Sequence, residues 1–268
     1  MILAFSDGLG LAAAAGAATA YALLALALAT TRLQGGTLRG LLLAAWLLHA
    51  ITLARALLGT PPRFGFAPAL SMTVWLVLTV YAVERRLFPQ LAAHWALAGL
   101  GGAAVILSLV FPGNSYHAIA SPWLPLHWAL GIASYGLFAA AVVHGWLMGR
   151  AERSMRQADE TDAGVPLLTL ERLTFRFVQA GFVLLSATLL VGWWFAETLY
   201  GPGLAWKWDH KTVFSVLAWL TFAGLLIGRS RLGWRGLKAV RVLYLGSALL
   251  LLSYAGSRFV LEVILRRA

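Results

Sequence analysis

The segment PLHWALGIASYGLFAAAVVHGWLMG, residues 125–149, decides the fold of this chain. It is 25 residues long and contains no Asp, Glu, Lys or Arg. An α-helix needs about 20 consecutive, mostly apolar residues to cross the hydrocarbon core of a bilayer. The segment therefore predicts a transmembrane helix.

Seven further segments meet the same criterion, so the sequence predicts an all-α, polytopic integral membrane helix bundle with about eight transmembrane helices. We expect a single transmembrane domain over residues 1–268 and no soluble domain. Pro61-Pro62, Pro89, Pro112 and Gly201-Pro202-Gly203 separate several of the spans, as helix-breaking residues should. The predicted spans are residues 9–31, 39–59, 68–87, 93–111, 125–149, 174–198, 210–228 and 238–263.

The composition agrees with a membrane protein and excludes several classes of function. Charged residues make up 12% of the chain, about half the ~25% typical of a soluble domain. Cysteine is absent, which excludes disulfides, thiol redox chemistry, thioether-linked haem and iron–sulfur clusters. The net charge of +11 lies in short loops, so we attribute it to topology and predict no nucleic-acid partner. No Walker A, GxGxxG, HExxH or GxSxG motif is present, and no enzymatic activity is predicted.

Lys and Arg are distributed unequally between alternate loops, and this asymmetry predicts the orientation. Cytoplasmic loops carry the excess of Lys and Arg. Both termini are therefore predicted to lie outside, in a bacterial inner (cytoplasmic) membrane. The richer set holds Arg32, Arg39, Arg85, Arg86, Arg150, Arg153, Arg156, Arg172, Arg176, Arg229, Arg231, Arg235, Lys238 and Arg241. The poorer set holds Arg63, Lys207, Lys211, Arg266 and Arg267.

Two histidines start spans at the predicted outer face. His127 begins the 125–149 span and is either an axial haem-iron ligand or a polar residue at the headgroup level. His210 begins the 210–228 span, directly after Trp206, Trp208 and Asp209. It is either a second axial ligand in an aromatic-lined pocket or part of a helix start that Asp209 caps. These two roles are compatible, because Asp209 could also orient the histidine ring.

Four polar residues inside spans leave alternatives open. His49 lies in the middle of the 39–59 span, where we expect it to be a ligand or an internal hydrogen-bond partner. His144 is expected at the cytoplasmic interface. Arg55 and Arg258, near the outer ends of their spans, either bind two propionates of haem b or snorkel to the headgroups.

Small residues and the scarcity of acids give two further expectations. Glycines such as Gly16, Gly99, Gly101 and Gly102 form either a dimer face or close packing inside the bundle. Intramembrane carboxylates are nearly absent, which makes an acidic proton relay difficult to build and disfavours a transporter.

Several motifs resemble the cytochrome c assembly membrane protein family, and most closely its small YpjD/HemX-like branch. The resemblance covers the second half of the chain in its motifs and the whole chain in its eight-span layout. The motifs are WKWDHKTVFSVLAWL (206–220), Gly233-Trp234-Arg235-Gly236, Tyr254-Ala255-Gly256-Ser257-Arg258-Phe259, and the segment from Leu126-His127-Trp128 to Ser134-Tyr135-Gly136.

The resemblance implies a haem site at the outer face. The CcsA and CcmC types use a tryptophan-rich outer segment flanked by histidines. His127 matches the histidine before that segment, and Trp206, Trp208 and Asp209 match its end. Most of the tryptophan-rich motif is missing, and the second external histidine has no counterpart, so the second ligand is expected to be His210 or His49.

Two functions follow as hypotheses. The first is a haem-binding, haem-handling membrane protein related to cytochrome c biogenesis, which binds, orients and passes on the cofactor to a haem-biogenesis or other membrane protein. The alternative is a cofactor-free membrane accessory or regulatory protein that acts through the basic cytoplasmic loops 150–173 and 229–241.

Overall fold

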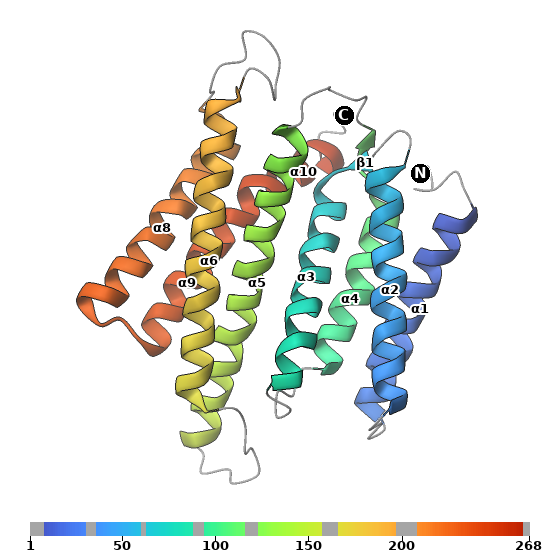
Figure 1. Cartoon of the computed structure of the whole chain (residues 1–268), viewed down its shortest axis with the longest axis horizontal. Coiled ribbons are helices and arrows are strands. Elements are labelled where there is room, and N and C mark those ends of the chain that lie inside the picture. The colour runs from blue at the N-terminus through green and yellow to red at the C-terminus, as the bar shows by residue number, and fades with distance from the viewer. Residues whose placement is uncertain are drawn as a thin grey trace. The chain divides into compact units, whose positions relative to one another are not determined.

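The computed structural model describes residues 8–30, 36–59, 63–87, 94–115, 123–156, 166–196 and 208–264, and helices dominate this part of the chain (Figure 1). The long helices are α1 (Gly8–Thr30), α2 (Gly36–Leu58), α3 (Phe66–Leu87), α4 (His94–Val110), α5 (Trp123–Arg156), α6 (Leu167–Trp194), α8 (His210–Leu232) and α9 (Gly236–Leu251). The chain then continues through a π-helical turn η1 (Leu252–Gly256), α10 (Ser257–Phe259) and a second π-helical turn η2 (Val260–Ile264).

The lengths of these helices confirm the predicted all-α polytopic membrane bundle. In the described part of the chain, seven helical segments are long and apolar enough to cross a membrane. The eighth predicted span corresponds to α4, which has 17 residues. At 1.5 Å per residue, α4 is about 26 Å long, close to the lower limit for a span.

The helix ends around the longest predicted loop differ from the prediction. α5 runs on to Arg156 and α6 begins at Leu167, so much of the expected loop 150–173 is helical. Hydropathy marks the part of a helix that lies in lipid. The polar residues beyond it, such as Glu152 and Arg153, are good helix formers and let α5 continue.

A short β-ribbon was not predicted. β1 (Arg63–Phe64) pairs antiparallel with β2 (Asn114–Ser115), with Arg63 opposite Ser115. Two-residue strands carry no alternating pattern that a sequence could reveal.

The contacts group the chain into two compact units, which are described separately. The first comprises Met1–Thr79, Ala92–Ala118 and Arg258–Ala268, and the second Val80–Leu91 and Ile119–Ser257.

In the first unit, α1 packs against α2 and α4, and glycines allow the close approach. A Cβ at Gly101 of α4 would lie 2.9 Å from the Tyr21 ring of α1, and one at Gly16 would lie 3.4 Å from Leu48 of α2. Gly102 also lies against Tyr21, whereas Gly99 faces open space. Gly16, Gly101 and Gly102 therefore serve close packing inside the bundle, which was one of the two predicted roles.

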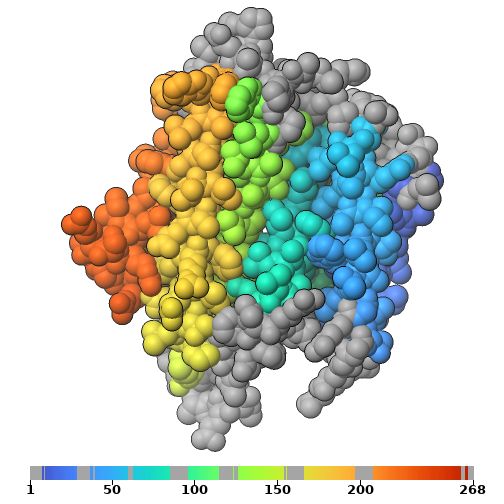
Figure 2. All heavy atoms as spheres, viewed as in Figure 1, coloured from blue at the N-terminus to red at the C-terminus, as the bar shows by residue number. Residues whose placement is uncertain are grey.

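In the second unit, α5 and α6 lie side by side, as both views show (Figure 1, Figure 2). Phe138 of α5 stacks on Phe222 of α8 with ring centroids 3.7 Å apart and planes within 6°. Gly181 of α6 packs on Phe138 and Gly246 of α9 packs on Phe222. The aromatic pair thus forms the centre of a four-helix core.

The turn between α8 and α9 explains the motif Gly233-Trp234-Arg235-Gly236. Gly233 ends α8 with φ 64°, a left-handed conformation that favours glycine. This reversal lets the Trp234 N–H donate to the Gly228 carbonyl at 3.0 Å and places the indole over Gly228. Lys238 lies over the same indole at 4.5 Å from the ring centroid.

Candidate functional site

His127 lies at the start of α5 with its ring against α6. Gly192 makes room for it, because a Cβ at this position would lie 3.1 Å from Cε1 of His127. The Nδ1 atom is buried and makes no well-directed hydrogen bond to a described residue. The Thr188 backbone, one turn before Gly192, and the charge of Lys211 both act on the ring. A buried ring nitrogen without a well-directed hydrogen bond is unusual in a folded protein and marks a candidate ligand site.

Aromatic residues lie next to this histidine. Trp123, one turn earlier in α5, stacks on Phe195 after the end of α6, with ring centroids 4.0 Å apart and planes within 11°. Trp193 and Trp194 follow Gly192 directly and are exposed. Exposed indoles at a helix end are typical of a membrane interface, where the ring is apolar and the N–H meets water.

The start of α8 confirms one of the roles predicted for Asp209. Its Oδ1 accepts a hydrogen bond from the Thr212 N–H at 2.8 Å, which makes it the N-cap residue. The His210 side chain is exposed, and none of the described contacts joins it to His127. Lys211 lies over the Tyr254 ring at 5.3 Å from its centroid. Among the described residues, the charge of Lys211 acts on the His127 ring, whereas no contact joins His210 to it.

Of the two tryptophans predicted for the site, the structure describes one. Trp208 is described and its side chain is 70% exposed. Trp206 lies outside the described residues, so its role stays a prediction.

His49 has the internal hydrogen-bond role that was one of its two predicted roles. Its Nε2 lies 2.8 Å from Oγ of Ser71, and its Nδ1 lies 3.4 Å from the Tyr21 hydroxyl. All three side chains are at most 1% exposed. Both ring nitrogens are engaged, and an iron ligand would have to break one of these contacts.

The two arginines predicted to bind propionates belong to the first unit. Arg55 is exposed near the end of α2, and Arg258 is half-buried in α10. His127 and His210 belong to the second unit. The predicted role of both arginines stays a prediction.

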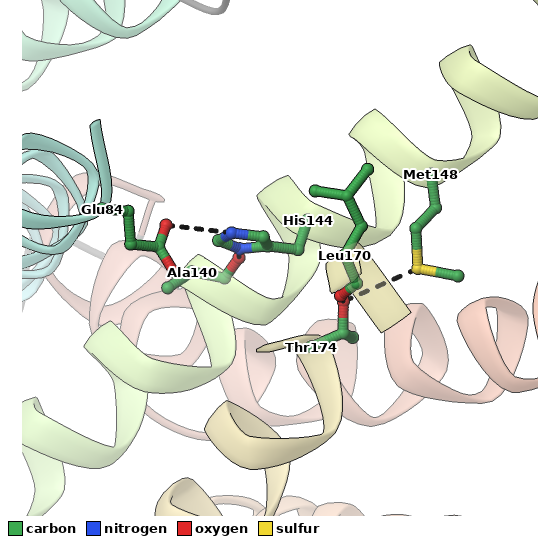
Figure 3. Close-up of polar contacts among 6 residues, drawn as sticks. All are labelled: Glu84, Ala140, His144, Met148, Leu170 and Thr174. Carbon is green, nitrogen blue, oxygen red and sulfur yellow. Dashed lines mark hydrogen bonds and ion pairs between the residues drawn. The ribbon is translucent and has the colours of Figure 1, made fainter. Parts of the chain in front are cut away.

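The sequence analysis missed a buried ionic contact towards the opposite end of α5 (Figure 3). His144 Nε2 lies 2.9 Å from Oε2 of Glu84, which belongs to the α3 segment of the second unit. The two residues are 3% and 6% exposed. The His144 side chain is buried within the bundle, and its predicted depth at the cytoplasmic interface stays a prediction. The contact could have been suspected from the sequence, because Glu84 is an acidic residue inside the predicted span 68–87.

A second ionic contact joins the beginning of α6 to the end of α8. Arg229 donates to Oε1 of Glu171 at 2.5 Å and lies over the Phe175 ring at 3.6 Å from its centroid. One turn away, the Thr174 hydroxyl donates to the Leu170 carbonyl at 2.8 Å, and Sδ of Met148 lies 3.6 Å from the same oxygen. Glu171 is therefore paired with an arginine, whereas Glu84 is paired with a histidine.

The comparison with known proteins identifies the family. Residues 35–265 match the family model described as Cytochrome C assembly protein. The chain belongs to this family. It is 30% identical to an uncharacterized 28.8 kDa protein of Azospirillum brasilense over 243 residues. The aligned region covers 88% of this chain and 80% of that protein. No solved structure matches the chain.

Two further relatives are similar over shorter stretches. The inner membrane protein YpjD of Escherichia coli K12 is 28% identical over 201 residues, 72% of each chain. The cytochrome c biogenesis protein CcsA of Prochlorococcus marinus is 26% identical over 220 residues, 70% of this chain and 69% of the relative. Family membership supports a role in cytochrome c biogenesis for this multi-pass membrane protein.

Proposed function

We propose that this protein binds haem through His127 at the outer face of the bacterial inner membrane and passes it on during cytochrome c biogenesis. The observation that carries the proposal is the placement of the His127 ring, which is held between two helices with its Nδ1 side against the α6 backbone. Histidine is a common axial ligand of haem iron, and haem supplies the group that cytochrome c assembly must deliver.

The surroundings of His127 suit an axial ligand. A histidine that binds iron through one ring nitrogen usually has the other nitrogen near a backbone carbonyl or carboxylate, which fixes the ring orientation. The Nδ1 side of His127 faces the backbone of α6 near Thr188 and Gly192. In this proposal Nε2 is the ligand atom, and the glycine at position 192 lets the ring reach the α6 backbone.

Charged residues near the start of α8 suit the rest of the cofactor. Haem carries two propionates, and the Lys211 ammonium is close enough for its charge to act on His127. We assign Lys211 to one propionate and keep His210 as a second candidate ligand of the iron. The protein then binds and orients a cofactor, haem b, without making or breaking covalent bonds.

Haem titration of the purified protein tests this proposal. We expect the wild type in detergent to bind haem close to one per chain, measured as pyridine haemochrome, with a sharp Soret band. His127→Ala should lose most of this haem, and His210→Ala should change the band position. Thr221→Ala, in the middle of α8, is the control. A protein that stays colourless after haemin titration contradicts the proposal.

A second candidate function has its own observation. The turn from α8 to α9 presents a set of exposed cations, Arg231, Arg235, Lys238 and Arg241. Such a surface suits an accessory protein that contacts an acidic partner at the membrane. Charge reversal of these residues should abolish co-purification of such a partner without changing haem content. If charge reversal leaves the co-purified partners unchanged, this second function is contradicted. If the protein also binds no haem, both proposed functions are contradicted.

A further inference from the structure

Glu84 and His144 form a polar contact that the proposed haem site does not use (Figure 3). Both side chains are more than nine-tenths buried in the second unit. Ionisable side chains inside transmembrane segments are costly and tend to have a functional role. Each must therefore have its charge compensated by a partner, and each is the other's ionic partner.

The hydrogen-bond partner of Nδ1 fixes the protonation of the His144 ring. Nδ1 lies 2.8 Å from the Ala140 carbonyl oxygen, one turn earlier in α5. A carbonyl oxygen can only accept, so Nδ1 carries a hydrogen and donates it. In the neutral ring, Nε2 then has only a lone pair.

The short distance to Glu84 requires one more proton. If His144 were neutral and Glu84 ionised, a nitrogen lone pair would face a carboxylate oxygen at 2.9 Å, and the two would repel. One proton must therefore lie between them, either on Nε2 as imidazolium or on Oε2 as carboxylic acid. In both forms the pair has no net charge, and loss of this proton leaves one negative charge.

The geometry indicates that no well-directed hydrogen bond holds this proton on one of the two atoms. Nε2 and both Glu84 oxygens lack a well-directed hydrogen bond in the described part of the chain, so the 2.9 Å contact is bent. Oε1 in particular faces no partner among the described residues and can accept a proton or a water. A bent contact stabilises its proton less than a straight hydrogen bond does.

No described charge competes with His144 for the Glu84 carboxylate. On α6, the centroid of the Phe177 ring lies 5.3 Å from that of the imidazole. On α9, the Tyr244 hydroxyl would lie 3.6 Å from a Cβ at Gly145, next to His144, and the charge of Arg153 acts on that tyrosine. Arg229 of α8 is paired with Glu171. Arg85 and Arg86 follow Glu84 in α3, and their side chains are outside the description.

We propose that Glu84 and His144 together form a proton-binding site inside the helix bundle, which takes up and releases one proton between Nε2 and Oε2. Release changes the net charge of the pair from zero to −1 and replaces an attraction between α3 and α5 by a repulsion. The site thus links proton occupancy to the contact between the end of α3 and α5. It is independent of haem, so failure of the haem proposal would leave it standing.

Infrared pH-difference spectroscopy of the purified, full-length protein tests this proposal, because it reports carboxyl and imidazole bands separately. We expect a carboxyl or carboxylate band and an imidazole band to titrate together with one apparent midpoint. Glu84→Gln should remove the carboxyl band and shift the midpoint of the imidazole band. His144→Gln should leave Glu84 as an uncompensated buried acid, so a protonated carboxyl band should persist to higher pH.

Glu171→Gln is the matched control, because Glu171 is the other carboxylate that is buried in the described part of this unit, and it is paired with an arginine. It should leave the coupled titration unchanged. If Glu84→Gln or His144→Gln fails to fold by circular dichroism, isotope labelling of histidine in the wild type still separates the imidazole band. Independent midpoints for the two bands, or no titration over the range in which the protein stays folded, would overturn the proposal.

Discussion

Gly192 is the residue on which the position of the His127 ring depends. Its missing side chain leaves the space in which the imidazole lies, since a Cβ there would approach Cε1 to 3.1 Å. Gly192→Val should push the ring away from α6 and lower haem occupancy several-fold while the helices stay intact. Gly131→Ala at the same α5–α6 contact is the control, because its Cβ would meet Thr188 at an ordinary 3.6 Å. Haem content per chain is the measurement, and equal occupancy in both variants would argue against His127 as the ligand.

Ser71 is a second residue with a testable role. Ser71→Ala removes the partner of His49 Nε2 and leaves a fully buried nitrogen unpaired. Interhelical hydrogen bonds in membranes average about 0.6–2 kcal/mol, so we expect a loss of about 1 kcal/mol in the free energy of unfolding in detergent. Thr221→Ala, whose hydroxyl bonds only to its own helix, should cost less. An unchanged stability of Ser71→Ala would show that His49 repacks.

Residues whose partners are near in sequence were predicted well, and those with distant partners were not. Asp209 was correctly predicted as an N-cap, because the Thr212 N–H it accepts from is three residues away. The contact of His144 with Glu84 was not predicted, because Glu84 lies on another helix. A local sequence pattern does not predict which helices pack against each other. The two possible roles of His49 could likewise be separated only by the positions of Ser71 and Tyr21.

At the scale of helices, glycine positions control how closely α8 and α9 approach. A Cβ at Gly246 would lie 2.7 Å from the Phe222 ring, whereas one at Gly224 would meet nothing within 4 Å. Gly246→Ala should therefore destabilise the protein by about 1–3 kcal/mol through overpacking. Gly224→Ala should be neutral or slightly stabilising, because alanine favours the helix. Thermal unfolding in detergent compares the two, and equal midpoints would contradict the core packing.

Helix existence was easier to predict than helix length. Each of the eight predicted spans corresponds to a described helix, because an apolar run of span length leaves the backbone no other way to satisfy its hydrogen bonds in lipid. The ends of α5 and α6 were not predicted, since these helices continue into polar sequence. The π-helical turns at residues 252–256 and 260–264 had no sequence signal that we recognised.

For the whole molecule, the excess of Lys and Arg in alternate loops predicts the orientation in the membrane. The absence of cysteine makes single-cysteine labelling clean. Ser230→Cys, at the end of α8, should react with a membrane-impermeant maleimide only after the cytoplasmic side is opened. Trp208→Cys, before the start of α8, should react in intact spheroplasts. The reverse pattern would place both termini in the cytoplasm and the His127 site on the inner face.

The central claim is that His127 binds haem iron, and chemical rescue tests it most directly. In His127→Gly the ligand is removed and a space the size of an imidazole remains at the α5–α6 contact. The account predicts that this variant loses the Soret band of haem-loaded wild type and that added imidazole restores it. A His127→Gly protein that keeps its full haem content, with a spectrum that imidazole does not change, would contradict the claim.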